Sequence, residues 1–187
     1  MRKIALTGNI ASGKSTVKNI LIKKGYKVLD TDDIAHKLLD KKSEIIISTF
    51  ANYDITENGK ISRQKLAKIV FNNTNLRQKL ENIIHPLIKI KIEDFFKANL
   101  DESIVFVEIP LVFEAGMQDL FDEILFIACD DEIRLKRLIL RNNITKQEAE
   151  NRINSQISQQ EKISKSNFVI YNNSTVQDLE NELNELF

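Results

Sequence analysis

The sequence predicts an α/β fold in which a five-stranded parallel sheet is flanked by helices. Short apolar runs rich in Ile, Val and Phe alternate with helical or polar stretches, which is typical of a parallel sheet covered on both faces. The expected strands are residues 3–7, 26–30, 104–109, 124–128 and 168–171. A glycine-containing loop follows the first of these strands, and this loop carries the clearest chemical signal in the chain.

The loop is Gly8-Asn9-Ile10-Ala11-Ser12-Gly13-Lys14-Ser15, which matches the phosphate-binding pattern G-x-x-x-x-G-K-[ST]. It follows an apolar strand and opens a helix over residues 15–24 that stops at Gly25. Its glycines let successive backbone N–H groups and the helix N-terminus face one anion. In such a loop Lys14 reaches the β- and γ-phosphates and the Ser15 hydroxyl coordinates Mg²⁺. The pattern therefore predicts a P-loop protein that binds a Mg-nucleotide.

Carboxylates follow the strands at the edge where open parallel sheets bind their ligands. Asp30 and Asp32 end the second strand, where either could orient an acceptor hydroxyl and accept its proton, or could cap the following helix. Asp33 is expected to be a capping or first-turn residue. Glu108 ends the third strand, and two roles stay open for it: action on Mg²⁺ through water, or a solvated charge at a strand end.

Two regions lack a strand pattern. Residues 35–100 are predicted to form a helical subdomain, with helices over 62–73 and 76–96 and with Pro86 kinking or breaking the second. Residues 134–166 are charged and contain Arg134, Arg137, Arg141 and Arg152, which suit either a lid that neutralises phosphoryl charge or an exposed helical face. The prediction is one domain over 1–187, with a core of about 1–34, 101–133 and 167–187.

Composition narrows the class of protein. Basic and acidic residues number 27 each, which gives no electrostatic footprint for nucleic acid. A single cysteine, Cys129, excludes an internal disulfide and is expected to be a small apolar residue on a strand. No apolar run of about eighteen residues is present for a membrane span, and the loop at residue 8 interrupts any signal sequence. We expect a cytoplasmic protein without an obligate protein partner.

An ordered series of motifs resembles the dephospho-CoA kinase family and covers about residues 2–180. The series runs Leu6-Thr7 with the loop and Thr16; Leu29-Asp30-Thr31-Asp32-Asp33-Ile34-Ala35-His36; Asn58-Gly59-Lys60-Ile61-Ser62-Arg63 with Val70-Phe71; Ile84-His85-Pro86-Leu87-Ile88; Ile109-Pro110-Leu111-Val112-Phe113-Glu114; Arg137 and Arg141; Arg152 and Gln156; and Val169-Ile170-Tyr171-Asn172-Asn173.

The resemblance implies ATP-dependent phosphorylation of the ribose 3′-hydroxyl of dephospho-CoA, which gives CoA and ADP and ends CoA biosynthesis. It implies ATP as donor, Mg²⁺ held by Ser15, and catalysis by Asp32 and Lys14. The ATP-binding residues it implies are Gly8, Ala11, Ser12, Gly13, Lys14, Ser15, Thr16, Arg137, Arg141 and Asn172, the last near the base. The acceptor-binding residues it implies are Asp32, Arg63, His85 and Glu114.

Two other functions are weighed against this one. Kinases of the same fold that act on a nucleoside monophosphate or on shikimate share the loop, but not the His-Pro and Pro-Leu-x-Phe-Glu motifs. A GTPase switch would need an Asn-Lys-x-Asp guanine motif, which the sequence does not contain. On its sequence context alone, His85 is better explained as a packed helix residue than as a catalytic one, and its neighbours offer no second zinc ligand at helical spacing.

Overall fold

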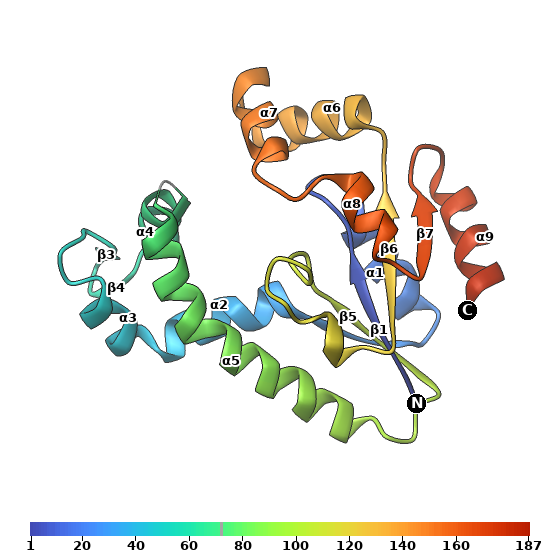
Figure 1. The fold of residues 1–187 in the computed structure, drawn as a ribbon, viewed down its shortest axis with the longest axis horizontal. Coiled ribbons are helices and arrows are strands. Elements are labelled where there is room, and N and C mark those ends of the chain that lie inside the picture. Colours follow the sequence, from blue (N-terminus) through green and yellow to red (C-terminus); the bar gives the residue numbers. More distant parts are fainter. Residues whose placement is uncertain (72) are drawn as a thin grey trace. The chain divides into compact units, whose positions relative to one another are not determined.

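The computed structural model describes residues 1–71 and 73–187, so residue 72 of the predicted helix over 62–73 lies outside the described part. The chain forms two compact units, which Figure 1 shows with their elements labelled. The first unit comprises Met1–Leu29 and Phe96–Phe187, and the second comprises Asp30–Phe95. In the described part of the chain, no helix is both long enough and apolar enough to cross a membrane.

The first unit holds the predicted five-stranded sheet, with strand order β2-β5-β1-β6-β7. The strands are β1 (Arg2–Thr7), β2 (Lys27–Asp30), β5 (Ile104–Glu108), β6 (Glu123–Ala128) and β7 (Phe168–Tyr171). The central strand β1 pairs in parallel with β5 and with β6, so Ile4 lies opposite Phe106 on one side and Glu123 on the other. The predicted parallel α/β architecture is confirmed.

The first unit also contains α1 (Lys14–Lys23), α6 (Asp131–Asn142), α7 (Lys146–Asn154), α8 (Gln159–Ser164) and α9 (Val176–Leu186), with a 3₁₀ turn at Gln118–Leu120. Helix α1 contacts β1, α8 contacts β6, and α9 contacts β7. Apolar side chains of α1 and α9 pack with those of β1, β5, β6 and β7 in one buried cluster, to which the tail helix contributes Leu179 and Leu183. Leu179 and Leu183 lie one turn apart on α9, so one face of the tail helix packs on the core.

The second unit is mainly helical. It contains α2 (Thr31–Lys41), α3 (Ser43–Thr49), α4 (Arg63–Phe71) and most of α5 (Thr74–Ala98), together with the short antiparallel strands β3 (Thr56–Glu57) and β4 (Lys60–Ile61). Helices α2 and α3 contact each other and β4, and Ile46 and Phe50 of this region are fully buried. The expectation that residues between the second and third sheet strands form no strand was wrong, because Asn58 and Gly59 both adopt positive φ and close a hairpin.

Pro86 was expected to kink or break its helix, and the structure shows that it does not break it. Helix α5 runs without interruption from Thr74 to Ala98, with Pro86 inside it. Pro86 lies on the exposed side, whereas Ile84, Ile88 and Ile92 are buried at helical spacing on the other. The burial of that apolar face outweighs the single backbone hydrogen bond that the proline removes.

Candidate active site

The phosphate loop lies between β1 and α1, and its two motif glycines serve different steric needs. Gly13 caps α1 with a φ of 97°, a left-handed conformation that glycine adopts without steric cost. Gly8 allows close packing, since a Cβ there would lie 2.5 Å from the backbone oxygen of Ile127 in β6. The loop therefore delivers the N-terminus of α1, with its unpaired N–H groups, to the edge of the sheet, and such an N-terminus favours anions.

Lys14 folds back across this loop. Its Nζ donates hydrogen bonds to the backbone oxygens of Gly8, at 2.7 Å, and Asn9, at 3.3 Å. The ammonium is thus held beside the loop backbone, where a phosphate bound by the loop amides would meet it. The side chain of the next residue, Ser15, is exposed in the first turn of α1.

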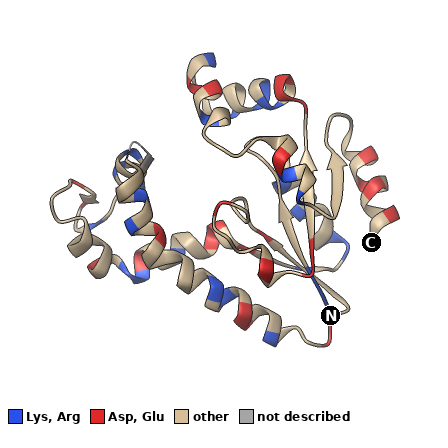
Figure 2. Cartoon of the chain, viewed as in Figure 1, with Lys and Arg blue, Asp and Glu red and all other residues tan. Residues whose placement is uncertain are grey.

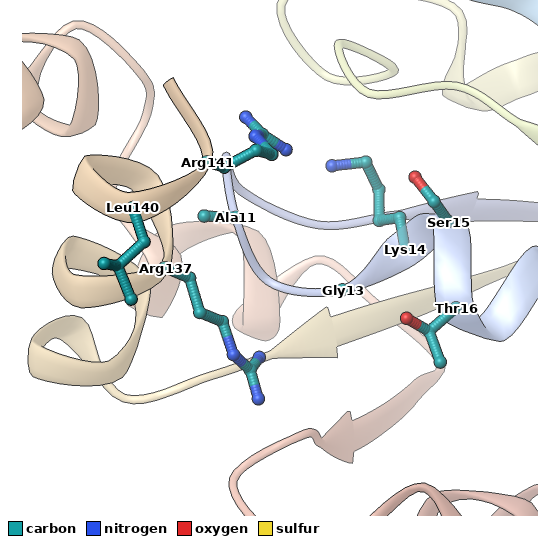
Figure 3. Close-up of a pocket in the computed structure, with 8 residues that line it drawn as sticks. All are labelled: Ala11, Gly13, Lys14, Ser15, Thr16, Arg137, Leu140 and Arg141. Carbon is teal, nitrogen blue, oxygen red and sulfur yellow. The ribbon is translucent and has the colours of Figure 1, made fainter. Parts of the chain in front are cut away.

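A pocket of about 600 Å³ opens beside the loop. It is lined by Ala11, Gly13, Lys14, Ser15 and Thr16 from the loop and α1, and by Arg137, Leu140 and Arg141 from α6. Figure 3 shows Arg137 and Arg141 projecting from α6 toward the loop. The structure thus brings Lys14, Arg137 and Arg141 together, as the sequence analysis grouped them, and three cations in one pocket suit a polyanionic ligand.

The arginines of the charged region differ in their surroundings. Arg134 is 2% exposed and pairs with Asp131 across 2.6 Å, so neither the exposed-face nor the lid interpretation fits this residue. Arg137 is half-buried and its Nη1 lies 3.4 Å from Sγ of Cys129. Arg141 is exposed. Arg137 and Arg141 are therefore the arginines of α6 that face the pocket.

Cys129 is a structural residue at the end of β6. It is fully buried, and burial raises the pKa of its thiol, against the opposing effect of the Arg137 and Arg134 charges. A raised thiol pKa keeps the sulfur protonated near neutral pH, where it is a poor nucleophile. Cys129 therefore behaves as the small buried residue that the sequence predicts, although it follows the strand rather than belonging to it.

Asn172 contacts the phosphate loop directly. Its side-chain Nδ2 donates a hydrogen bond to the backbone oxygen of Ser12 over 2.8 Å, and its own backbone N–H bonds the oxygen of Ala128. The residue is 8% exposed. The resemblance placed Asn172 near the base of ATP; what the structure shows is a side chain that holds the backbone of the phosphate loop.

Two acidic residues, one at the end of β5 and one after it, form ion pairs with lysines. Glu108 is 6% exposed and its Oε2 lies 3.0 Å from Nζ of Lys18 on α1, so it is not a solvated strand-end charge. Glu114 lies 2.6 Å from Nζ of Lys162 on α8, and the Lys162 side chain is fully buried. The sequence did not reveal either lysine as a partner, because neither lies in a motif and Lys162 falls in a mostly polar stretch.

The second unit begins with the carboxylates at the end of β2 and just after it. The Asp30 side chain is the N-cap of α2, because its Oδ1 accepts hydrogen bonds from the backbone N–H groups of Asp32, at 2.9 Å, and Asp33, at 3.2 Å. Asp32 and Asp33 are themselves exposed in the first turn of α2. The capping role that was open to Asp30 and Asp32 therefore belongs to Asp30.

Arg63 and His85 also belong to the second unit. Arg63 is exposed at the start of α4 and its Nη2 lies 3.0 Å from Oδ2 of Asp40. His85 is half-buried in α5, and burial lowers the pKa of its imidazole, against the opposing charge of Glu81. Of the residues implied to bind the acceptor, Asp32, Arg63 and His85 thus share one unit, and Glu114 belongs to the other.

The residues at the loop fit a magnesium ion that is held mainly by water and phosphate. Among residues 1–71 and 73–187, no group of three or more His, Cys, Asp or Glu side chains is placed to hold a metal. Mg²⁺ commonly takes only one or two protein ligands and fills its shell with waters and substrate phosphates. The exposed Ser15 hydroxyl, which lines the pocket, meets that requirement.

A parallel sheet whose first strand leads into a phosphate loop, with arginines facing that loop from a later helix, defines a P-loop kinase. Comparison with known proteins agrees at the level of the fold. A shikimate kinase from Acinetobacter baumannii superposes with a TM-score of 0.54 at 13% identity, over 100% of this chain and 92% of the other.

Closer similarities identify the family. The family model described as dephospho-CoA kinase matches residues 2–178. Dephospho-CoA kinases of Fusobacterium nucleatum and Listeria innocua are 46% and 40% identical, covering 89% and 90% of this chain and 86% of each relative. The chain belongs to the dephospho-CoA kinase family.

Solved structures support the assignment. A dephospho-CoA kinase from Campylobacter jejuni is 35% identical with a TM-score of 0.73, over 98% of this chain and 94% of the other. A protein of Thermus thermophilus is 32% identical with a TM-score of 0.89, over 99% of this chain and 95% of the other. The predicted family and the predicted kinase activity are confirmed.

Proposed function

We propose that this chain transfers the γ-phosphoryl group of Mg-ATP to the ribose 3′-hydroxyl of dephospho-CoA, giving CoA and ADP, the last step of CoA biosynthesis. The observation that carries the proposal is the pocket in which a phosphate loop and two arginines meet, in a chain of the dephospho-CoA kinase family. In the reaction the hydroxyl oxygen bonds the γ-phosphorus as the bond to the bridging oxygen of ADP breaks, and the hydroxyl proton leaves.

The donor side follows from the geometry of the pocket. ATP phosphates bind the loop amides from Ala11 to Thr16 and the Lys14 ammonium, which exchanges its carbonyl partners Gly8 and Asn9 for phosphate oxygens. Arg137 and Arg141 offset the charge that spreads over the transferred group in the transition state. Ser15 holds Mg²⁺, which when bound neutralises charge on the β- and γ-phosphates.

The acceptor side is assigned through the family. Asp32 orients the ribose hydroxyl and takes its proton, a role left to it because Asp30 supplies the helix cap. Arg63, His85 and Glu114 bind the remainder of dephospho-CoA. The lid proposed over 134–166 carries Arg137 and Arg141, and its closure would exclude water that competes as acceptor.

The mixed surface charge suits an enzyme of small molecules, which we propose to be cytoplasmic. Figure 2 shows Lys and Arg interspersed with Asp and Glu along α6 and α7, and the formal net charge is zero. Neither α6 nor α7 therefore presents the basic stripe by which proteins bind nucleic acid backbones. The partner that we propose is the small-molecule substrate dephospho-CoA.

The test is an ADP-release assay with Mg-ATP and three alternative acceptors: dephospho-CoA, AMP and adenosine. We expect robust turnover with dephospho-CoA and little with the other two, because binding energy from the pantetheine arm helps to position the ribose. Equal rates with AMP would overturn the acceptor assignment and would favour a nucleoside monophosphate kinase. Shikimate serves as a fourth acceptor that shares the fold but not the chemistry.

A further inference from the structure

The N-terminal half of the phosphate loop is fastened to a segment distant in sequence. The backbone N–H of Ile10 donates to Oε1 of Gln156 over 2.8 Å, and Nδ2 of Asn9 donates to the backbone oxygen of Ile157 over 3.1 Å. These two adjacent hydrogen bonds, which we call the loop latch, join consecutive loop residues to consecutive residues between α7 and α8.

The latch is well shielded from water on the loop side. The Asn9 side chain is 2% exposed and its neighbour Ser12 is fully buried, whereas Gln156 and Ile157 are half-buried. Between Ile10 and Ser12 the chain turns through Ala11, whose φ of 61° is uncommon for a residue with a side chain. A left-handed alanine persists only where its surroundings fix the backbone, and the latch lies immediately before it.

A residue close to the same segment also forms a hydrogen bond with the chain just before α6, where the charged helical region begins. Oε1 of Gln159, the first residue of α8, accepts a hydrogen bond over 3.0 Å from the backbone N–H of Cys129, which lies two residues before α6. Both ends of the α6–α7 pair, which carries Arg137 and Arg141, are therefore connected to one short stretch around Gln156 and Gln159. The same stretch holds the phosphate loop through the two hydrogen bonds of the loop latch.

We propose that Gln156 is a positioning residue for ATP, which sets the backbone of the phosphate loop and couples it to the arginine-bearing helices. It touches no reacting atom and acts through Ile10. The inference rests on the proposed function only in taking ATP as the donor, since the acceptor has no part in it. Without the acceptor oxygen of Gln156, the Ile10 N–H loses its partner and the turn at Ala11 loses one of its restraints.

Gln156→Met is the test variant, because methionine is of similar length and lacks the acceptor. The first measurement is hydrogen exchange of the Ile10 amide in the ATP-free protein, which we expect to speed up. The second is the affinity for a non-hydrolysable ATP analogue with Mg²⁺, which we expect to fall about tenfold, the usual worth of one hydrogen bond. Neither measurement involves dephospho-CoA, so failure of the latch and failure of the acceptor assignment are distinguishable.

Gln177→Met is the matched control, since Gln177 on α9 is exposed and bonds Asn181 one turn along its helix. It should leave both measurements unchanged. If Gln156→Met does not fold, Gln156→Asn takes its place, because the shorter side chain keeps an amide but falls short of Ile10. A faster-exchanging Ile10 amide with unchanged analogue affinity would overturn the proposal and leave Gln156 a purely structural partner. An unchanged exchange rate would show that the bond itself is absent in solution.

Discussion

Asn172 donates a hydrogen bond to the backbone oxygen of Ser12 over 2.8 Å, and the same amide nitrogen occupies the space into which a Cβ on Gly13 would project. The end of β7 therefore packs against the loop at the point where α1 begins. This arrangement excludes a side chain at Gly13 for two reasons, the contact with Asn172 and the left-handed φ of 97°.

The two reasons can be separated by a double-mutant cycle. Gly13→Ala should lower the free energy of unfolding and weaken ATP binding. In an Asn172→Ala background its cost should shrink, because the contact is gone, but should not vanish, because the φ penalty remains. We expect a coupling energy of about 1 kcal/mol or more from urea unfolding of the four proteins. If the changes in unfolding free energy of the two single mutants simply add in the double mutant, Asn172 does not restrict the space at Gly13.

Asp32→Asn tests the assigned base. The replacement is nearly isosteric, and the helix cap is supplied by Asp30, so folding should be unaffected. Loss of the proton acceptor should lower kcat by ~10²–10⁴-fold, with ATP affinity roughly constant. Single-turnover phosphoryl transfer measures the effect, with Asp33→Asn as the neighbouring control in the same helical turn. Near-normal transfer by Asp32→Asn, or a larger loss in Asp33→Asn, would place the base elsewhere.

The ion pair between Lys162 and Glu114 should respond unequally to loss of its two partners. The Lys162 side chain is fully buried, whereas that of Glu114 is 23% exposed. Glu114→Ala leaves an ammonium buried without its partner, which costs about 3 kcal/mol of unfolding free energy. Lys162→Met leaves a carboxylate that can reach water, so we expect about 1 kcal/mol or less. Urea unfolding measures both, and the reverse order would contradict this account of the pair.

His85 gives a prediction for pH. Burial lowers the pKa of its imidazole in the folded state, so the unfolded chain binds the proton more readily. The contribution of His85 to stability is therefore present above the unfolded pKa of about 6.5 and is lost on acidification below it. When the pH is lowered from 8 to 5.5, the urea midpoint of unfolding should fall further in the wild type than in His85→Gln. Equal falls would show that the folded state does not penalise the charged imidazole.

The sheet and the phosphate loop were predictable from the sequence, because their signals are local. Each strand is a short apolar run, and the loop is a fixed pattern of eight residues between a strand and a helix. The hairpin at β3–β4 also had a local signal in Asn58-Gly59, but its strands are only two residues long and show no alternation. Strands this short cannot show the alternation of apolar and polar residues, so the Asn58-Gly59 turn was the available sequence signal for the hairpin.

Other features depend on contacts between distant segments and leave no pattern in the sequence. The pairing of Lys162 with Glu114 and the hydrogen bond from Ile10 to Gln156 both join parts of the chain that the fold alone brings together. The continuity of α5 through Pro86 likewise depends on burial of the opposite face of the helix. Local propensity disfavours a proline there, and tertiary packing overrides it.

Phosphorylation of the ribose 3′-hydroxyl of dephospho-CoA is best tested by identifying the product. The purified protein is incubated with Mg-ATP and dephospho-CoA, and the product is analysed by mass spectrometry and by phosphorus NMR. We predict a product heavier by one phosphoryl group, with the new phosphomonoester on the 3′-oxygen of the ribose and ADP formed in equal amount. Phosphorylation at another position, or ADP formed with inorganic phosphate and unmodified dephospho-CoA, would contradict the account.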